Sequence, residues 1–218
     1  MMASAFINLI STGNYQKLRE TLTDNPALAN SGIPCSDNDT RKGHPLHRIC
    51  DAVYSKTITD EQAIEIAKIF LAFGADIDGY KSSGDNNTPL IAASSLHAEK
   101  LGIFYIEQGA DIFYAGGDGA TALHWAAFCG RDKLVAALIA KGAKIDQPDT
   151  TFYSTAIGWA VHTLTSNDSH NLYHQLACIK LLLKAGADRK LLHVDTLKYL
   201  QDVAENDLDL KKLLEKSN

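Results

Sequence analysis

Two segments of the sequence place histidine and cysteine side chains at spacings that suit a metal ion. One is H-x2-H-x2-C, from His44 to Cys50, and the other is H-x3-H-x3-C, from His170 through His174 to Cys178. Residues three or four positions apart share a helix face, and imidazole and thiolate groups are ligands that zinc prefers. What these side chains can do therefore depends on the elements that carry them.

Other catalytic patterns are missing from the sequence. It contains no glycine-rich phosphate loop, no G-x-S-x-G motif and no H-E-x-x-H motif. Serine, aspartate and histidine residues occur, but no spacing joins them into a triad. We therefore expect no enzyme activity and no cofactor.

Two short motifs recur in a fixed order along the chain. The first motif is glycine, alanine and a polar residue, and it follows an apolar segment. The second motif starts with threonine or histidine and is followed by small residues. The first motif begins at Gly74, Gly109, Gly142 and Gly186, and the second at His44, Thr88, Thr121 and Thr155. Interleaved markers of this kind indicate one supersecondary unit that has been copied several times.

The residue types of the repeat predict a pair of helices. A threonine hydroxyl caps a helix N-terminus, and Pro45 and Pro89 stand where a helix needs no N–H group. The second helix carries an apolar stripe at i, i+3 and i+4, as in Leu101, Phe104 and Tyr105. Glycine then ends the helix in a left-handed conformation. One copy cannot bury its stripe alone, so neighbouring copies must stack.

The copy that starts at Thr121 carries the sequence T-A-L-H-W-A-A, with Gly130 and then Gly142 following it. With a period near 33 residues it resembles the ankyrin repeat, which consists of a β-turn and two antiparallel helices. The resemblance implies an all-α ankyrin-repeat solenoid with four recognisable repeats and two capping units in a single domain, 1–218. The expected parts are an N-terminal cap (1–38), repeats over 39–82, 83–115, 116–149 and 150–190, and a C-terminal cap (191–218).

The repeat assignment gives the candidate metal ligands other roles. His47 takes the position of the ordinary repeat histidine, Cys50 that of a small core residue, and Cys178 lies on the apolar stripe. His170 and His174 remain, and two ligands do not close a zinc site. We expect no metal, while a metal-binding or small-ligand-binding protein built around His170 and His174 stays an alternative.

The first and fourth repeats are longer than the other two. The additional residues fall between the two helices, at 51–61 and 163–174, and Thr59 with Gln62 forms a capping-box pattern there. We expect both insertions to project from the edge opposite the β-turn fingers. They either form a partner surface, as in a regulatory subunit of a stable complex, or are tolerated loop growth.

The resemblance also implies where a partner would bind. Proteins of this kind grip partners with their finger tips and with exposed positions late in the first helix, on a rigid concave face. Aromatic residues concentrate in the C-terminal half of that face, where they favour binding, whereas we interpret Trp125 and Trp159 as packing between repeats. The predicted partner-binding residues are Phe152, Tyr153, Phe128, Cys129, His162, Tyr114, Phe113, Asp118, Asp85 and Ser95.

Composition limits the class of partner. The net charge of −5 and the scattered basic residues argue against nucleic acid, and no apolar stretch reaches membrane-spanning length. The N-terminus lacks the basic region of a signal peptide, and the four cysteines show no paired spacing. We therefore expect a cytoplasmic, monomeric, non-enzymatic module that binds a protein.

Overall fold

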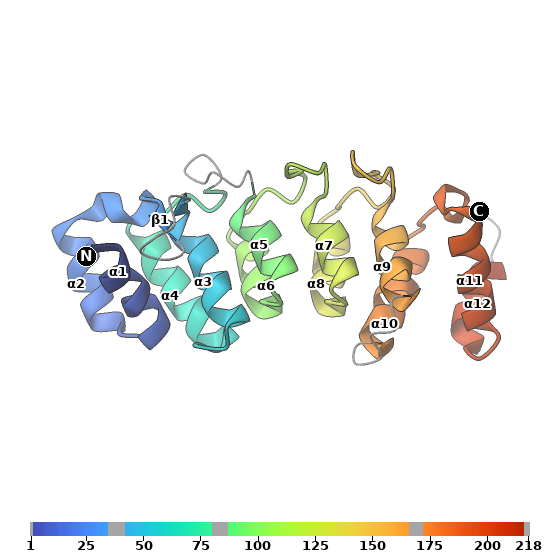
Figure 1. Ribbon diagram of the computed structural model, residues 1–218, viewed down its shortest axis with the longest axis horizontal. Helices are drawn as coiled ribbons and strands as arrows, with labels where there is room; N and C mark the ends of the chain where they lie inside the picture. Colours follow the sequence, from blue (N-terminus) through green and yellow to red (C-terminus); the bar gives the residue numbers. More distant parts are fainter. Residues whose placement is uncertain (1, 35–41, 80–86, 166–171, 216–218) are drawn as a thin grey trace. The chain divides into compact units, whose positions relative to one another are not determined.

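The computed structural model describes residues 2–34, 42–79, 87–165 and 172–215. Its contacts divide the chain into two compact units, unit 1 from Met1 to Gly117 and unit 2 from Asp118 to Asn218. In each unit the helices stand in pairs, with longer loops leading from one pair to the next (Figure 1). The predicted all-α fold is confirmed, whereas the grouping of all repeats into one domain stays a prediction.

Unit 1 holds the N-terminal cap and the first two repeats. Its small sheet is antiparallel, with Ile33 opposite Gly43 and Pro34 opposite Lys42. The elements of unit 1 are α1 (Met2–Thr12), α2 (Tyr15–Asp24), η1 (Pro26–Asn30), β1 (Ile33–Pro34), β2 (Lys42–Gly43), α3 (Pro45–Tyr54), α4 (Asp60–Ala72), α5 (Pro89–Ser95) and α6 (Glu99–Glu107).

Unit 2 holds the last two repeats and a C-terminal helix pair. The elements of unit 2 are α7 (Ala122–Phe128), α8 (Asp132–Ala140), α9 (Ala156–Thr165), α10 (Leu172–Lys184), η4 (Arg189–Leu191), α11 (Val194–Ala204) and α12 (Leu208–Glu215). Helices α1–α2 and α11–α12 lie within the ranges predicted as caps, and their capping role stays a prediction.

The recurring residues cap the helices as predicted. Thr88 Oγ1 accepts the N–H of Ile91 at 3.3 Å, and His44 Nδ1 takes the same role for α3. At the other end of a pair, Gly142 has φ +86° after α8, and the N–H of Ala143 donates back to the Leu138 carbonyl at 3.0 Å. A side chain at such a φ is strained, which explains why each copy ends with glycine.

The apolar stripe of the second helix forms the core. All three residues predicted on α6, Leu101, Phe104 and Tyr105, are buried. The stripe is less complete in unit 2, where Ala137 of α8 and Leu181 of α10 are only half-buried. The stripe therefore needs the neighbouring helix pair to cover it, as stacking requires.

Both insertions lengthen helices. In the first repeat α3 and α4 have 10 and 13 residues, against 7 and 9 in α5 and α6. In the fourth repeat α9 and α10 have 10 and 13 residues, against 7 and 9 in α7 and α8, and they extend further from the finger loops (Figure 1). Each helix gains about one turn. In the first insertion residues 51–54, 60 and 61 are helical, and in the second all the described residues, 163–165 and 172–174, are helical.

The longer helices satisfy backbone groups of their neighbours. The predicted capping box at Thr59 starts α4, and the Asp60 carboxylate then accepts the N–H groups of Lys100 and Leu101 at the start of α6, at 3.0 and 3.1 Å. In unit 2 the last carbonyl of α7 is covered in the same way by side chains of α9 and α10. Asp60 and Thr163 of the insertions therefore satisfy backbone groups at the termini of α6 and α7.

Candidate functional site

Four aromatic side chains line one pocket in unit 2. Trp125 and Phe128 come from α7, Phe152 from the loop between α8 and α9, and Trp159 from α9. The pocket has a volume of about 410 Å³. Its remaining walls are Ser154, Gly158, His162 and Thr196. Within the part of the chain that the structure describes, no lysine, arginine, aspartate or glutamate lines this pocket.

Trp159 lies at the centre of the aromatic cluster. Its ring centroid is 5.1 Å from that of Trp125, 5.7 Å from that of Phe128 and 6.1 Å from that of Phe152. The planes of these pairs meet at 77°, 75° and 73°, which are the edge-to-face arrangements that aromatic quadrupoles favour. Trp159 is 8% exposed and Phe152 is 68% exposed, so the cluster runs from the core to the surface.

Helix α7 presents two of the four rings on one face. Trp125 and Phe128 are three residues apart and so share one face, while Ala126 and Ala127 are buried on the other. Thr163 Oγ1 and Gln175 Nε2 both donate to the Phe128 carbonyl, at 3.0 and 2.6 Å. The end of α7 that carries Phe128 is therefore fixed by the longer helices of the fourth repeat.

A buried carboxylate holds the finger loop. Asp149 Oδ1 accepts the N–H groups of Thr151 and Phe152, at 2.8 and 2.5 Å, and Oδ2 accepts the N–H of Ser154 at 3.0 Å. Oδ2 also accepts the indole N–H of Trp159 at 2.9 Å. Asp149 is 1% exposed, and its carboxylate joins the backbone of Phe152 to the ring of Trp159.

The same hydrogen bonds set the charge state of Asp149. Burial alone raises the pKa of a carboxyl group, but the four N–H donors favour the charged form and outweigh it, so the pKa of Asp149 lies below its ordinary value. The neighbouring Tyr153 has φ +53° and is 80% exposed. Asp149 thus stabilises a tight, strained finger tip in its ionised form.

A glycine of α9 allows a close approach in the pocket wall. In the third repeat His124 follows Thr121 by three positions, accepts the Thr121 N–H at Nδ1 (3.1 Å) and packs against Trp159. In the fourth repeat Gly158 stands at the corresponding position after Thr155. A Cβ added at Gly158 would lie 2.2 Å from Ser154 Oγ. Glycine at this position therefore lets the Ser154 side chain pack closely against α9.

The structure brings three of the predicted binding residues of unit 2 together. Phe128, Phe152 and His162 line the pocket, as the aromatic C-terminal half of the predicted face requires. Tyr153 and Asp118 are exposed outside it. Cys129 is half-buried, and burial raises the pKa of its thiol to about 11, so it is no reactive thiolate at neutral pH. The role of all of these residues in binding stays a prediction.

The sequence reasoning missed five residues of the pocket. Trp125 and Trp159 do pack between helices, as interpreted, but both also line the pocket. Gly158 could have been found from the sequence, because glycine stands there in place of the histidine of the repeat pattern. Nothing in the sequence pointed to Ser154 or Thr196.

Four of the predicted binding residues belong to unit 1. Phe113 is 50% exposed, and Tyr114 and Ser95 are half-buried. Asp85 lies outside the described residues. None of the three described residues lines a pocket of unit 1 found among the described residues.

The histidines of the first metal-like segment serve the fold. His44 is 1% exposed and caps α3, and its Nε2 lies 3.1 Å from Asn30 Oδ1. Burial lowers the pKa of His44 to about 4, against an opposing effect of the Asp76 charge. Cys50 is fully buried, with its Sγ 3.4 Å from the Leu46 carbonyl. These contacts match the packing roles that the repeat assigns.

The second segment is only partly described. His174 Nδ1 lies 2.7 Å from Asp132 Oδ1, and Cys178 is fully buried. His170 falls outside the described residues. Where the structure does describe side chains, it brings together no group of three or more histidine, cysteine, aspartate or glutamate residues that suits a metal ion.

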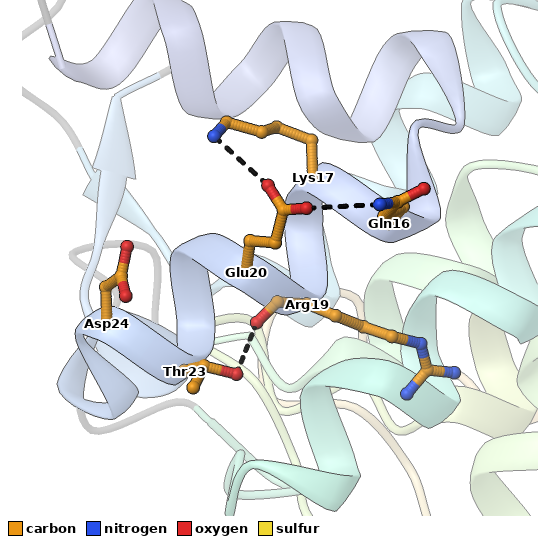
Figure 2. Close-up of a pocket in the computed structure, with 6 residues that line it drawn as sticks. All are labelled: Gln16, Lys17, Arg19, Glu20, Thr23 and Asp24. Atoms are coloured by element: carbon orange, nitrogen blue, oxygen red, sulfur yellow. Dashed lines mark hydrogen bonds and ion pairs between the residues drawn. The ribbon is translucent and has the colours of Figure 1, made fainter.

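A second hollow lies on the outer face of α2 (Figure 2). Glu20 Oε1 accepts from Gln16 Nε2 and its Oε2 pairs with Lys17 Nζ, both at 3.2 Å, while Arg19 points away from this group. All six lining residues come from this single helix. Pairs at i+3 and i+4 are ordinary on a solvated helix face, and one helix cannot enclose a ligand.

No helix among residues 2–34, 42–79, 87–165 and 172–215 has both the length and the apolar character to cross a membrane.

Comparisons with known proteins agree with the repeats. Residues 49–149 match the family model described as ankyrin repeats (3 copies). Palmitoyltransferase ZDHHC13 of Mus musculus is 35% identical over 113 residues, and palmitoyltransferase ZDHHC17 of Danio rerio is 33% identical over 102 residues.

These two alignments cover 48% and 44% of this chain but only 17% and 15% of the relatives. The chain thus matches less than a fifth of either relative, so their acyl transfer activity is a property of those proteins. The matched family model and the capped helix pairs confirm the resemblance: this chain carries ankyrin repeats in the all-helical fold of that family.

Proposed function

We propose that the chain binds a protein partner through the aromatic pocket of unit 2, without catalytic chemistry of its own. Ankyrin repeats are protein-interaction modules, and the proposal assigns that general role to one surface. The observation that carries it is the exposure of Phe152, 68%, beside three further rings in one pocket. Large exposed aromatic side chains contribute most of the energy at interface centres.

Rigidity supports the proposal. The Asp149 carboxylate fixes the finger tip, and the Phe128 carbonyl is held by Thr163 and Gln175. A surface that is ordered before binding loses little conformational entropy when the partner arrives. The pocket therefore has the preformed geometry that a binding module needs.

The charges of the chain favour a protein over a nucleic acid. The net charge is −5, and no basic side chain lines the pocket in the described part of the chain. We infer a monomer that works inside the cell and meets its partner in solution. The predicted residues of unit 1 would extend the contact beyond the pocket.

The longer helices support a structural role for the insertions. Their polar side chains already bind backbone groups of α6 and α7. A partner surface there would have to use exposed residues such as Tyr54, which is 59% exposed at the end of α3.

Capture of partners from the source cell's lysate tests the proposal. The bait is the full chain, as wild type, as Phe152→Ser, as Tyr54→Ser and as Tyr173→Ser. Tyr173 is the matched control, because it is a 79% exposed aromatic residue of the same unit that lies outside the pocket. We expect wild type and Tyr173→Ser to capture the same protein, and the purified protein to bind Phe152→Ser at least about tenfold more weakly.

Equal binding to Phe152→Ser would contradict the proposal. If Tyr54→Ser loses binding and Phe152→Ser does not, the binding site lies on the longer helices instead. Circular dichroism of each variant confirms that the fold is retained.

A further inference from the structure

Resting on the proposed function, we propose that the aromatic pocket of unit 2 takes a methylated lysine side chain of the protein partner. The proposed function gives only a class of partner, a protein, and this inference names the side chain that enters the pocket. It depends on the ring geometry, on the polar groups of the wall and on the charges around the pocket.

The ring geometry suits a cation. An ammonium group is attracted to the face of an aromatic ring when it lies within about 6 Å of the ring centroid, and tryptophan is the strongest partner. Four aromatic rings, two of them indoles, line this one pocket, so a cation that enters it lies beside several rings.

The polar groups of the wall select a methylated cation over a free one. Lysine and arginine bring three and five N–H donors, which need acceptors when they leave water. The pocket offers the hydroxyls of Ser154 and Thr196 and the ring of His162, but no carboxylate among the described residues. A trimethylammonium group has no N–H that needs an acceptor, so its transfer from water into the pocket costs less free energy.

The charges around the pocket complement a cation. No lysine or arginine of the described chain lines it, so entry of a positive group meets no like charge at the wall. Behind the wall, the buried Asp149 carboxylate accepts the indole N–H of Trp159 at 2.9 Å. This bond polarises the indole and adds negative potential on the side of the ring.

The pocket has room for the whole end of the side chain. Its volume of about 410 Å³ falls within the range of sites that bind small organic groups, about 300–1,000 Å³.

Tryptophan fluorescence provides the test, because the chain has two tryptophans and both line the pocket. The full chain is titrated with N-acetyl-trimethyllysine methylamide, with its unmethylated counterpart, and with a neutral analogue in which carbon replaces the charged nitrogen. Choline is the fourth probe. We expect trimethyllysine to bind at least about fivefold more tightly than the other two lysine-derived probes, and more tightly than choline.

Two variants locate the response. Phe152→Leu keeps an apolar side chain but removes one ring, and we expect about fivefold weaker binding of trimethyllysine. Tyr173→Leu, which changes an exposed ring outside the pocket, keeps wild-type affinity.

Equal affinity for the neutral analogue would overturn the inference, because the pocket would then be only hydrophobic. Tighter binding of choline would assign the pocket to a small molecule or lipid headgroup instead. No response to any probe at millimolar concentration would also overturn it. Each of these results leaves the capture experiment with Phe152→Ser intact, so failure of the occupant and failure of the binding module are distinguishable.

Discussion

The Asp149 carboxylate offers the sharpest test of how the pocket is held. In Asp149→Asn the side chain keeps its shape but has one accepting oxygen instead of two. The amide nitrogen then faces either the pair of N–H groups from Thr151 and Phe152 or the pair from Ser154 and Trp159. In both cases two N–H donors lose their acceptor; the three backbone donors are part-buried and the indole donor is buried.

The magnitude follows from these two bonds. A hydrogen bond to a charged group contributes about 1.5 kcal/mol or more, and a buried donor without an acceptor carries a similar penalty. Because Asp149 is 1% exposed, solvent compensates only partly for the lost bonds. We expect the free energy of unfolding of unit 2 to fall by about 3 kcal/mol.

Urea unfolding followed by tryptophan fluorescence measures this loss, because Trp125 and Trp159 both belong to unit 2. Asp118→Asn is the control, an exposed aspartate of the same unit, and we expect it to change stability by less than about 0.5 kcal/mol. In a Trp159→Phe background, Asp149→Asn should cost at least about 1 kcal/mol less, since the indole donor is gone. Equal urea midpoints for Asp149→Asn and Asp118→Asn would refute the reasoning.

Two further predictions concern the caps of the repeat. Burial lowers the pKa of His44 to about 4 from an unfolded value of 6.5, so the folded state favours the neutral ring and loses stability as pH falls from 6.5 towards 4. At pH 5 we expect a loss of about 2 kcal/mol relative to pH 7, measured by amide hydrogen exchange in α3; a loss of the same size in the non-titrating His44→Asn would contradict it. Gly142→Ala places a Cβ at φ +86° with no atom within 4 Å, so backbone strain alone should cost about 1–2 kcal/mol in the fluorescence-monitored urea transition. A variant as stable as wild type would show that this glycine is not required by its conformation.

The fold could be predicted from the sequence because neighbouring local signals agreed with one another. Thr88 and Pro89 start a helix, Gly109 ends the second one, and both act as predicted. The capping box at Thr59 even gave the start of a lengthened helix correctly. Such signals depend on backbone geometry within a few residues, which single-sequence reasoning handles well.

The candidate site was only partly predictable because it depends on contacts between repeats. The positions of Phe128 and Phe152 followed from the repeat register. The role of Asp149 did not, because its four donors are set by the closed finger loop and by an indole ten residues away. The lengthened second helix of the first insertion was predicted from the capping box at Thr59, whereas the hydrogen bond from Thr163 to the Phe128 carbonyl was not, because it joins two different repeats.

Photo-cross-linking in the source cell tests the central claim most directly. Benzoylphenylalanine replaces Tyr153, which is exposed on the finger beside the pocket, or Tyr173 as a control on α10. We predict that position 153 forms a covalent adduct with one protein, that position 173 does not, and that Phe152→Ser abolishes the adduct. An adduct from position 173 alone, or one from position 153 that survives Phe152→Ser, would contradict the assignment of the pocket as the binding site.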